Sequence, residues 1–193
     1  MGGQANNPFE AGKRLIRPLM ATDQKCCVEI VLAISVKQTM SLLWNTISRE
    51  TETFVVLLKN AVLKKLGNQF VNPRVRIIAY GDFYMDECAM WCSPFFEIPG
   101  EERKMAEFLW SIEPEGGGEK KSGMEALLCA MYSPWSRRTG DRRHIIALIT
   151  DSGAYIPEEP LRGIDCEYEE RLETYLPREY VPMPETLEEM RQL

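Results

Sequence analysis

The stretch VEIVLAISVKQTMS, residues 28–41, decides the fold of this chain. It contains a continuous apolar run at residues 30–34, and we predict a strand at 27–34 that is buried on both faces of a sheet. Ser35, Lys37 and Thr39 follow at alternating positions. In open parallel sheets, ligands bind at the carboxyl ends of the strands. The polar residues after this strand are therefore the first candidates for a functional site.

Strand and helix patterns alternate along the rest of the chain. A chain of 193 residues, 45% of them hydrophobic, is large enough for one domain with a substantial core. Apolar alternation predicts a strand at 75–83, an antiparallel edge strand at 93–98 and a fully buried strand at 144–150. Three- and four-residue apolar spacing predicts one long helix and four shorter ones, at residues 41–66, 101–112, 123–132, 161–175 and 185–192. This order predicts an α/β fold with three layers, in which helices cover both faces of a mostly parallel central sheet.

Charge and hydropathy narrow the classes of partner. Residues 152–193 hold 11 acidic and 4 basic side chains, which argues against nucleic acid as a partner. No apolar run approaches the length of a membrane span, and residues 1–24 read as a loose lead-in without an apolar signal segment. We therefore expect a cytoplasmic protein without membrane association. The domain would occupy residues 25–193, with an acidic helical segment at 155–193.

Four segments, in the same order, resemble the von Willebrand factor type A (vWA) domain family. They are LAISVKQTM (32–40), VRIIAYGDF (75–83), EPEGGGEKKSGMEALLCAM (113–131) and HIIALITDSGAY (144–155). The glycine-rich loop in the third segment is similar to that of bacterial members. The resemblance implies a Rossmann-like fold and a non-enzymatic role in protein binding, as a scaffold module within a larger assembly.

The resemblance also implies a place for a metal-ion-dependent adhesion site. In the family, an aspartate and two hydroxyls after the first strand hold Mg²⁺ together with acids from two later loops. This chain has Ser35 in place of that aspartate, Lys37 in place of the first hydroxyl and Thr39 at the second. Glu119 and Asp151 stand at the two acidic positions.

Two of these five positions are changed in a way that opposes a metal ion. The serine removes a negative charge, and Lys37 adds a positive charge that repels a divalent ion by several kcal/mol, or about 8 kcal/mol at 4 Å with an effective dielectric constant of 20. We expect no cofactor, with the Lys37 ammonium in the ion's place, paired with Asp151 and Glu119. One alternative is a derelict site in which Lys37 extends into solvent. The other is a reduced shell in which Ser35, Thr39, Glu119 and Asp151 still bind Mg²⁺ through water.

Other polar residues have supporting or structural interpretations. Asp82 and Ser152 are candidates for a second shell around the site, and Asp82 alone also fits a simple turn acid. His144, the only histidine, begins a strand at the opposite end of the sheet, so we assign it a structural role. No Ser/His/Asp set, Cys–His pair or phosphate loop is found, and we expect the chain not to be an enzyme.

The sheet is expected to end at the strand 144–150. Family domains continue with further strands, whereas no apolar strand pattern follows residue 150 here. We therefore expect the last strands to be missing and one edge to be exposed. Another protein chain, the lead-in 1–24 or the acidic segment 155–193 would cover that edge.

Overall fold

The structure is a computed structural model that describes residues 27–66, 73–114, 119–136, 142–155, 170, 172–177 and 188. The lead-in 1–24, the helix expected at 185–192 apart from residue 188, and most of the helix expected at 161–175 lie outside these residues. Within the described ranges, no helix is long and apolar enough to cross a lipid bilayer.

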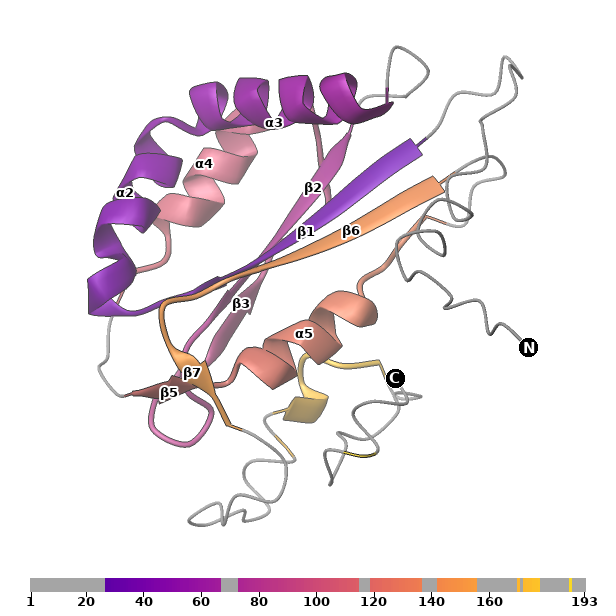
Figure 1. Cartoon of the computed structure of the whole chain (residues 1–193). Coiled ribbons are helices and arrows are strands. Elements are labelled where there is room, and N and C mark those ends of the chain that lie inside the picture. The colour runs from indigo at the N-terminus through magenta and orange to yellow at the C-terminus, as the bar shows by residue number, and fades with distance from the viewer. Residues whose placement is uncertain are drawn as a thin grey trace, which may run out of the picture.

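A mostly parallel sheet forms the centre of the molecule (Figure 1). The first strand, β1 (Cys27–Ser35), lies between β2 (Arg74–Tyr80) and β6 (Arg142–Ile149) and runs parallel to both. Two short strands, β3 (Met90–Cys92) and β4 (Phe96–Glu97), pair antiparallel with β2. In place of the single antiparallel edge strand expected at 93–98, the structure has two short strands, of which β4 lies within that range and β3 precedes it.

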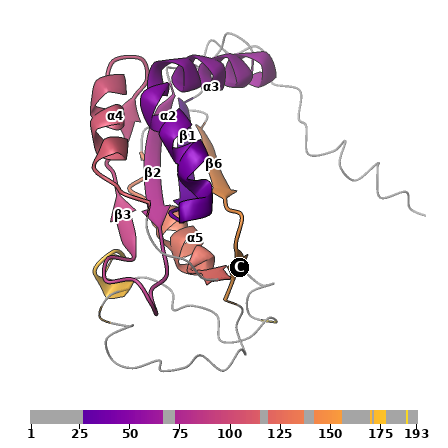
Figure 2. The same cartoon turned by 90° about the vertical axis from the view of Figure 1, so that its left-hand side faces the viewer.

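Helices cover both faces of this sheet and give three layers (Figures 1 and 2). One face carries α2 (Ser41–Arg49), α3 (Thr51–Leu66) and α4 (Glu102–Trp110), and the other carries α5 (Gly123–Met131). A short 3₁₀ turn, η1 (Gln38–Met40), joins β1 to α2. The prediction of a three-layer, Rossmann-like α/β fold is confirmed.

Alternation along β1 divides the core into two parts. Ile30, Leu32 and Ile34 face the layer of α2, α3 and α4, where they pack with residues such as Trp44. Val31 and Ala33 face α5. All of β1 from Val28 to Ser35 is buried, as expected for a strand with neighbours on both sides and helices on both faces.

Two expectations about the elements are wrong. The helix expected at 41–66 is interrupted at Glu50, whose φ of −110° and ψ of 34° lie outside the helical range. Ser48 and Thr51, on either side of this break, donate hydroxyl hydrogen bonds to the preceding turn's carbonyls, an arrangement that competes with regular helix. The strand expected to be fully buried, β6, exposes 39% of Ile145 and 43% of Leu148, because it is the outermost strand of the described sheet.

Candidate functional site

Four segments meet at the carboxyl ends of β1, β2 and β6, and together we call them the rim: residues 35–40, 81–86, 119–122 and 150–155. Figure 1 shows this end of the sheet at the lower left, where the small strands β5 (Lys120–Lys121) and β7 (Gly153–Ala154) lie. The convergence of these segments follows from the parallel course of the three strands, which places their carboxyl ends at one edge.

The segments after β1 and β6 are joined by a direct side-chain contact. The Thr39 hydroxyl donates a hydrogen bond of 2.5 Å to Oδ2 of Asp151, and the Ser152 hydroxyl donates one of 3.2 Å to Oδ1. The bond from Thr39 is the main reason that the pKa of Asp151 lies below its ordinary value, and Ser152 and Lys37 lower it further. No ion pair at contact distance joins the described residues Lys37 and Asp151. Thr39 therefore makes the contact that sequence analysis assigned to Lys37.

Backbone pairing joins the third segment to the fourth. The strands β5 and β7 form a parallel two-stranded sheet, and the amide of Gly153 donates to the carbonyl of Glu119. The side chain of Glu119 is on an exposed residue, so it is the backbone of this residue that contributes to the rim. The third segment also contacts the second: the Ser122 hydroxyl accepts a 2.9 Å bond from the amide of Phe83.

Asp82 is a turn acid, one of the two roles that its sequence position suggested, and it also contacts the fourth rim segment. One carboxylate oxygen accepts the amide of Tyr84 within the turn, and the other accepts the hydroxyl of Tyr155 at 2.9 Å. Burial and the nearby Asp82 carboxylate raise the pKa of the Tyr155 phenol, which therefore stays protonated and keeps donating. This buried aspartate thus links the second and fourth segments of the rim.

A buried ion pair within the rim was not anticipated from the sequence. Lys121, with 1% of its side chain exposed, lies 3.1 Å from Oδ2 of Asp86. The same oxygen accepts the amide of Asp82 at 2.7 Å. The sequence gives little sign of this burial, because Lys121 is simply the second of two adjacent lysines. In the two-residue strand β5, Lys121 points inward and Lys120 is half-buried.

The remaining predicted site residue, Ser35, lies apart from this network. It is fully buried, and its hydroxyl has no hydrogen-bond partner among the described residues. It follows the same alternation as Val31 and Ala33, so it faces α5. The structure brings Thr39, Asp151 and Ser152 into contact, while Ser35 and the Glu119 side chain take no part in the network.

The structure brings together only part of the Mg²⁺ shell that the resemblance implies, because Thr39 and Asp151 meet while Ser35 and the Glu119 side chain lie apart from them. Magnesium requires about six oxygens in near-octahedral geometry. The Thr39 hydroxyl already donates to Asp151, and the positive charge of Lys37 already acts on that carboxylate. Among the described residues, no group of three His, Cys, Asp or Glu side chains is arranged to hold a metal.

A cleft of about 790 Å³ opens beside the rim. Its apolar lining includes Val36, which follows β1, and Trp91 from β3; Met85, from the second rim segment, is 78% exposed. Acidic residues also line it: Asp86, Glu87 and Glu113. The volume lies in the range of small-molecule and side-chain binding sites.

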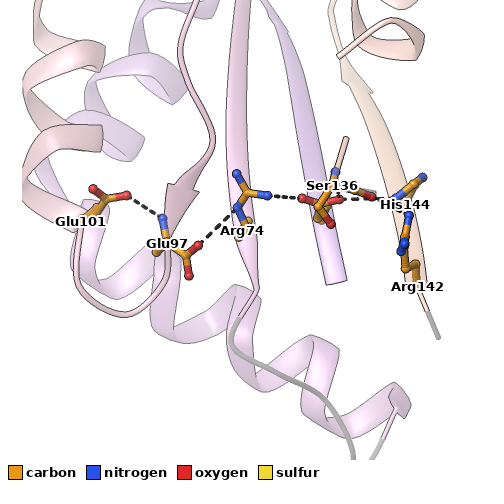
Figure 3. Close-up of polar contacts among 7 residues, drawn as sticks. Arg74, Glu97, Glu101, Ser136, Arg142 and His144 are labelled. Carbon is orange, nitrogen blue, oxygen red and sulfur yellow. Dashed lines mark hydrogen bonds and ion pairs between the residues drawn. The ribbon is translucent and has the colours of Figure 1, made fainter. Parts of the chain in front are cut away.

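A second polar cluster lies at the opposite end of the sheet (Figure 3). Glu29, a buried carboxylate in β1, accepts hydrogen bonds from Arg74 at 2.5 Å and from the amide of Ser136 at 2.9 Å. His144 in β6 lies 3.4 Å from Glu29 and stacks on Trp135 with ring centroids 4.4 Å apart. This end of the sheet ties three adjacent strands together and fits the structural role expected for His144.

Comparisons with known proteins place few constraints on this site. No protein-family model and no curated protein matches the chain. Among solved structures, the chain is similar to the pilus adhesin SpaC of Lactobacillus rhamnosus GG in its open conformation, with 18% identity and a TM-score of 0.45 over 66% of this chain and 15% of that one. Another form of the same adhesin gives 16% identity and a TM-score of 0.46 over 66% and 16%. The chain therefore spans less than a fifth of the adhesin's length.

Proposed function

We propose that this chain is a non-enzymatic protein-interaction module of the vWA type whose rim presents a binding surface without a metal ion. The single observation that supports this most is the bond between Thr39 and Asp151, which joins the first and fourth rim segments directly. In the family that the chain resembles, a bound cation has that role.

Further contacts support the same proposal by fixing the other rim segments. Asp82 bonds to Tyr155, and the buried amine of Lys121 pairs with Asp86. The ammonium group of Lys121 supplies positive charge to the carboxylate of Asp86, as a metal ion would to its ligands. A rim held in one arrangement before binding loses less conformational freedom when a partner docks.

The cleft beside the rim gives the partner a place to bury part of its surface. An exposed methionine such as Met85 adapts to irregular partner surfaces. A partly buried tryptophan such as Trp91 provides a large contact area at low entropic cost. We infer that the protein partner contacts the rim and the apolar wall of this cleft together.

Metal titration tests the first half of the proposal. Calorimetry with Mg²⁺ and with Mn²⁺ should show no sub-millimolar binding to the wild-type chain. The double variant Ser35→Asp with Lys37→Ser restores the family pattern and should gain binding. Sub-millimolar affinity in the wild type would favour the alternative, a Mg²⁺-dependent ligand-binding domain with a reduced metal shell.

Affinity purification from the native host tests the second half. The proteins retained by the wild-type chain should be the same in EDTA and in Mg²⁺, and Lys37→Glu and Met85→Asp should each lose them. Arg103→Asp, an exposed change on α4 away from the rim, is the matched control and should retain them. Capture that requires Mg²⁺, or that survives both rim-side variants, would contradict the proposal.

A cytoplasmic location belongs to the same proposal. Cys88, Cys92 and Cys129 are free thiols, and such residues persist most readily in a reducing compartment. The resemblance of the glycine-rich loop to bacterial members supports a bacterial origin.

A further inference from the structure

The outer edge of β6 carries exposed apolar side chains and, within the residues that the structure describes, has no neighbouring strand. Among the described residues, β6 pairs only with β1. Ile145 and Leu148 are 39% and 43% exposed, and alternation places them on opposite faces of the sheet. A strand that exposes apolar side chains on both faces is suited to having another strand added at its edge.

Charges at the two ends of β6 make this edge complementary to itself. Arg143, near the start of the strand, and Asp151, just beyond its end, are both exposed and carry opposite charge. Two copies related by a twofold axis run antiparallel, so the start of one strand lies against the end of the other. We propose that β6 pairs antiparallel with β6 of a second copy of this chain and forms a sheet that continues through a dimer.

The side chains select one register for this pairing. Directly opposed residues of an antiparallel pair point to the same face, so the twofold axis must pass through a residue. With the axis at Ala147, Arg143 comes opposite the bend that follows the partner's β6, where Asp151 lies. The apolar residues then oppose one another: Ile145 faces the partner's Ile149, and Ile146 faces the partner's Leu148.

Neighbouring registers lose this match. With the axis at Ile146, Arg143 opposes an isoleucine and His144 opposes a leucine, so polar and apolar side chains face each other.

The hydrogen bonds that Asp151 accepts from Thr39 and Ser152 leave capacity for an arginine, because a carboxylate has about four acceptor positions. One strand pair buries less than a standard interface of about 1,600 Å², so we expect a dimer with a micromolar dissociation constant.

Sedimentation of the full chain over a range of concentrations tests the dimer. The wild type should dimerise reversibly. Arg143→Asp and Asp151→Arg should each weaken association about tenfold or more, because each variant places two like charges opposite each other at both ends of the strand pair. An equimolar mixture of the two variants should recover it, since both charge pairs are then matched. Arg103→Asp makes the same charge change on an exposed α4 residue and should leave association unchanged.

Amide hydrogen exchange of the same samples locates the interface. Protection along residues 145–149 should rise with protein concentration in the wild type and stay low in Arg143→Asp. A monomer at every concentration would overturn the proposal, as would a dimer that tolerates Arg143→Asp or one whose β6 amides exchange as they do in the monomer. Arg143 lies at the end of β6 away from the rim, so such a failure would leave the proposed binding function standing.

Discussion

At the scale of single residues, the most informative side chain is the buried amine of Lys121. A charged group with 1% exposure is stable only when it is paired, and Asp86, at 23% exposure, is its partner. The corresponding positive charge was expected from Lys37, which is only half-buried. The rim thus contains a buried positive charge, but the side chain that carries it belongs to the third rim segment.

Asp86→Ala should destabilise the fold strongly because it leaves the Lys121 ammonium buried without its partner. Removing one member of a buried pair costs about 3 kcal/mol in free energy of unfolding, to be measured by urea denaturation. Glu107→Ala, which breaks the exposed pair with Arg103, is the control and should cost less than about 1 kcal/mol. Similar losses in the two variants would show that Lys121 does not depend on Asp86.

The hydrogen bond from Thr39 should be visible in the titration of Asp151. Because this bond is the largest cause of the lowered pKa, Thr39→Val should raise that pKa toward its ordinary value of 3.8, whereas Thr39→Ser should not. A group with a lowered folded-state pKa stabilises the fold above its unfolded pKa and loses that effect as the pH falls through the folded value. The stability difference between wild type and Thr39→Val should therefore shrink as the pH falls below about 4. Carboxyl NMR titration measures the shift, and an unchanged pKa in Thr39→Val would contradict this account.

At the scale of elements, the sequence was sufficient wherever hydrophobic periodicity determines the structure. The predicted strands at β1, β2 and β6 and the helices α4 and α5 are confirmed within a few residues. Periodicity could not reveal the break at Glu50, since apolar spacing continues across it and the interruption depends on hydroxyl-to-backbone bonds. Periodicity alone predicted β6 as a fully buried strand, and its position at the edge of the described sheet was expected only because no apolar strand pattern follows residue 150.

The candidate site was predictable in its location but less so in its contacts. The carboxyl ends of parallel strands must share one edge, so Thr39 and Asp151 could be placed together from the sequence. Their direct bond could not, because it depends on the turn at 38–40 that directs the Thr39 hydroxyl toward the fourth segment. The inward orientation of Lys121 follows from a two-residue strand, which is too short to give a sequence signal.

A substitution at Gly81, which follows β2, tests how closely the backbone there packs against the carboxylate of Asp86. A Cβ atom there would lie 2.3 Å from Oδ2 of Asp86, the oxygen that pairs with Lys121. Gly81→Ala should therefore displace the carboxylate and lower the melting temperature, with a loss of about 1–3 kcal/mol. Gly153→Ala meets only ordinary contacts at 3.8 Å or more and is the control. Equal melting temperatures for the two variants would show that Asp86 moves aside freely.

At the scale of the whole molecule, the cluster around Glu29 joins β1, β2 and β6 at the end remote from the rim. Glu29→Ala should lower the free energy of unfolding by about 3–5 kcal/mol, because it leaves the guanidinium of Arg74 partly buried beside a vacated site. Glu97→Ala removes a carboxylate 3.4 Å from the same arginine, but that carboxylate is 56% exposed, so the loss should stay below about 1 kcal/mol. Guanidinium chloride denaturation distinguishes them, and a larger loss for Glu97→Ala would be contrary to this assignment.

The position of β1 between β2 and β6 has a consequence for synthesis of the protein. Glu29 and Ser136 are 107 residues apart in the chain, and β6 follows later still. A ribosome adding about 5–20 residues per second emits β1 roughly 5–20 s before β6 can reach it. Throughout that interval, the edge of β1 that later pairs with β6 has no neighbouring strand in the nascent polypeptide. Newly made molecules should therefore depend on chaperones more than the finished domain does.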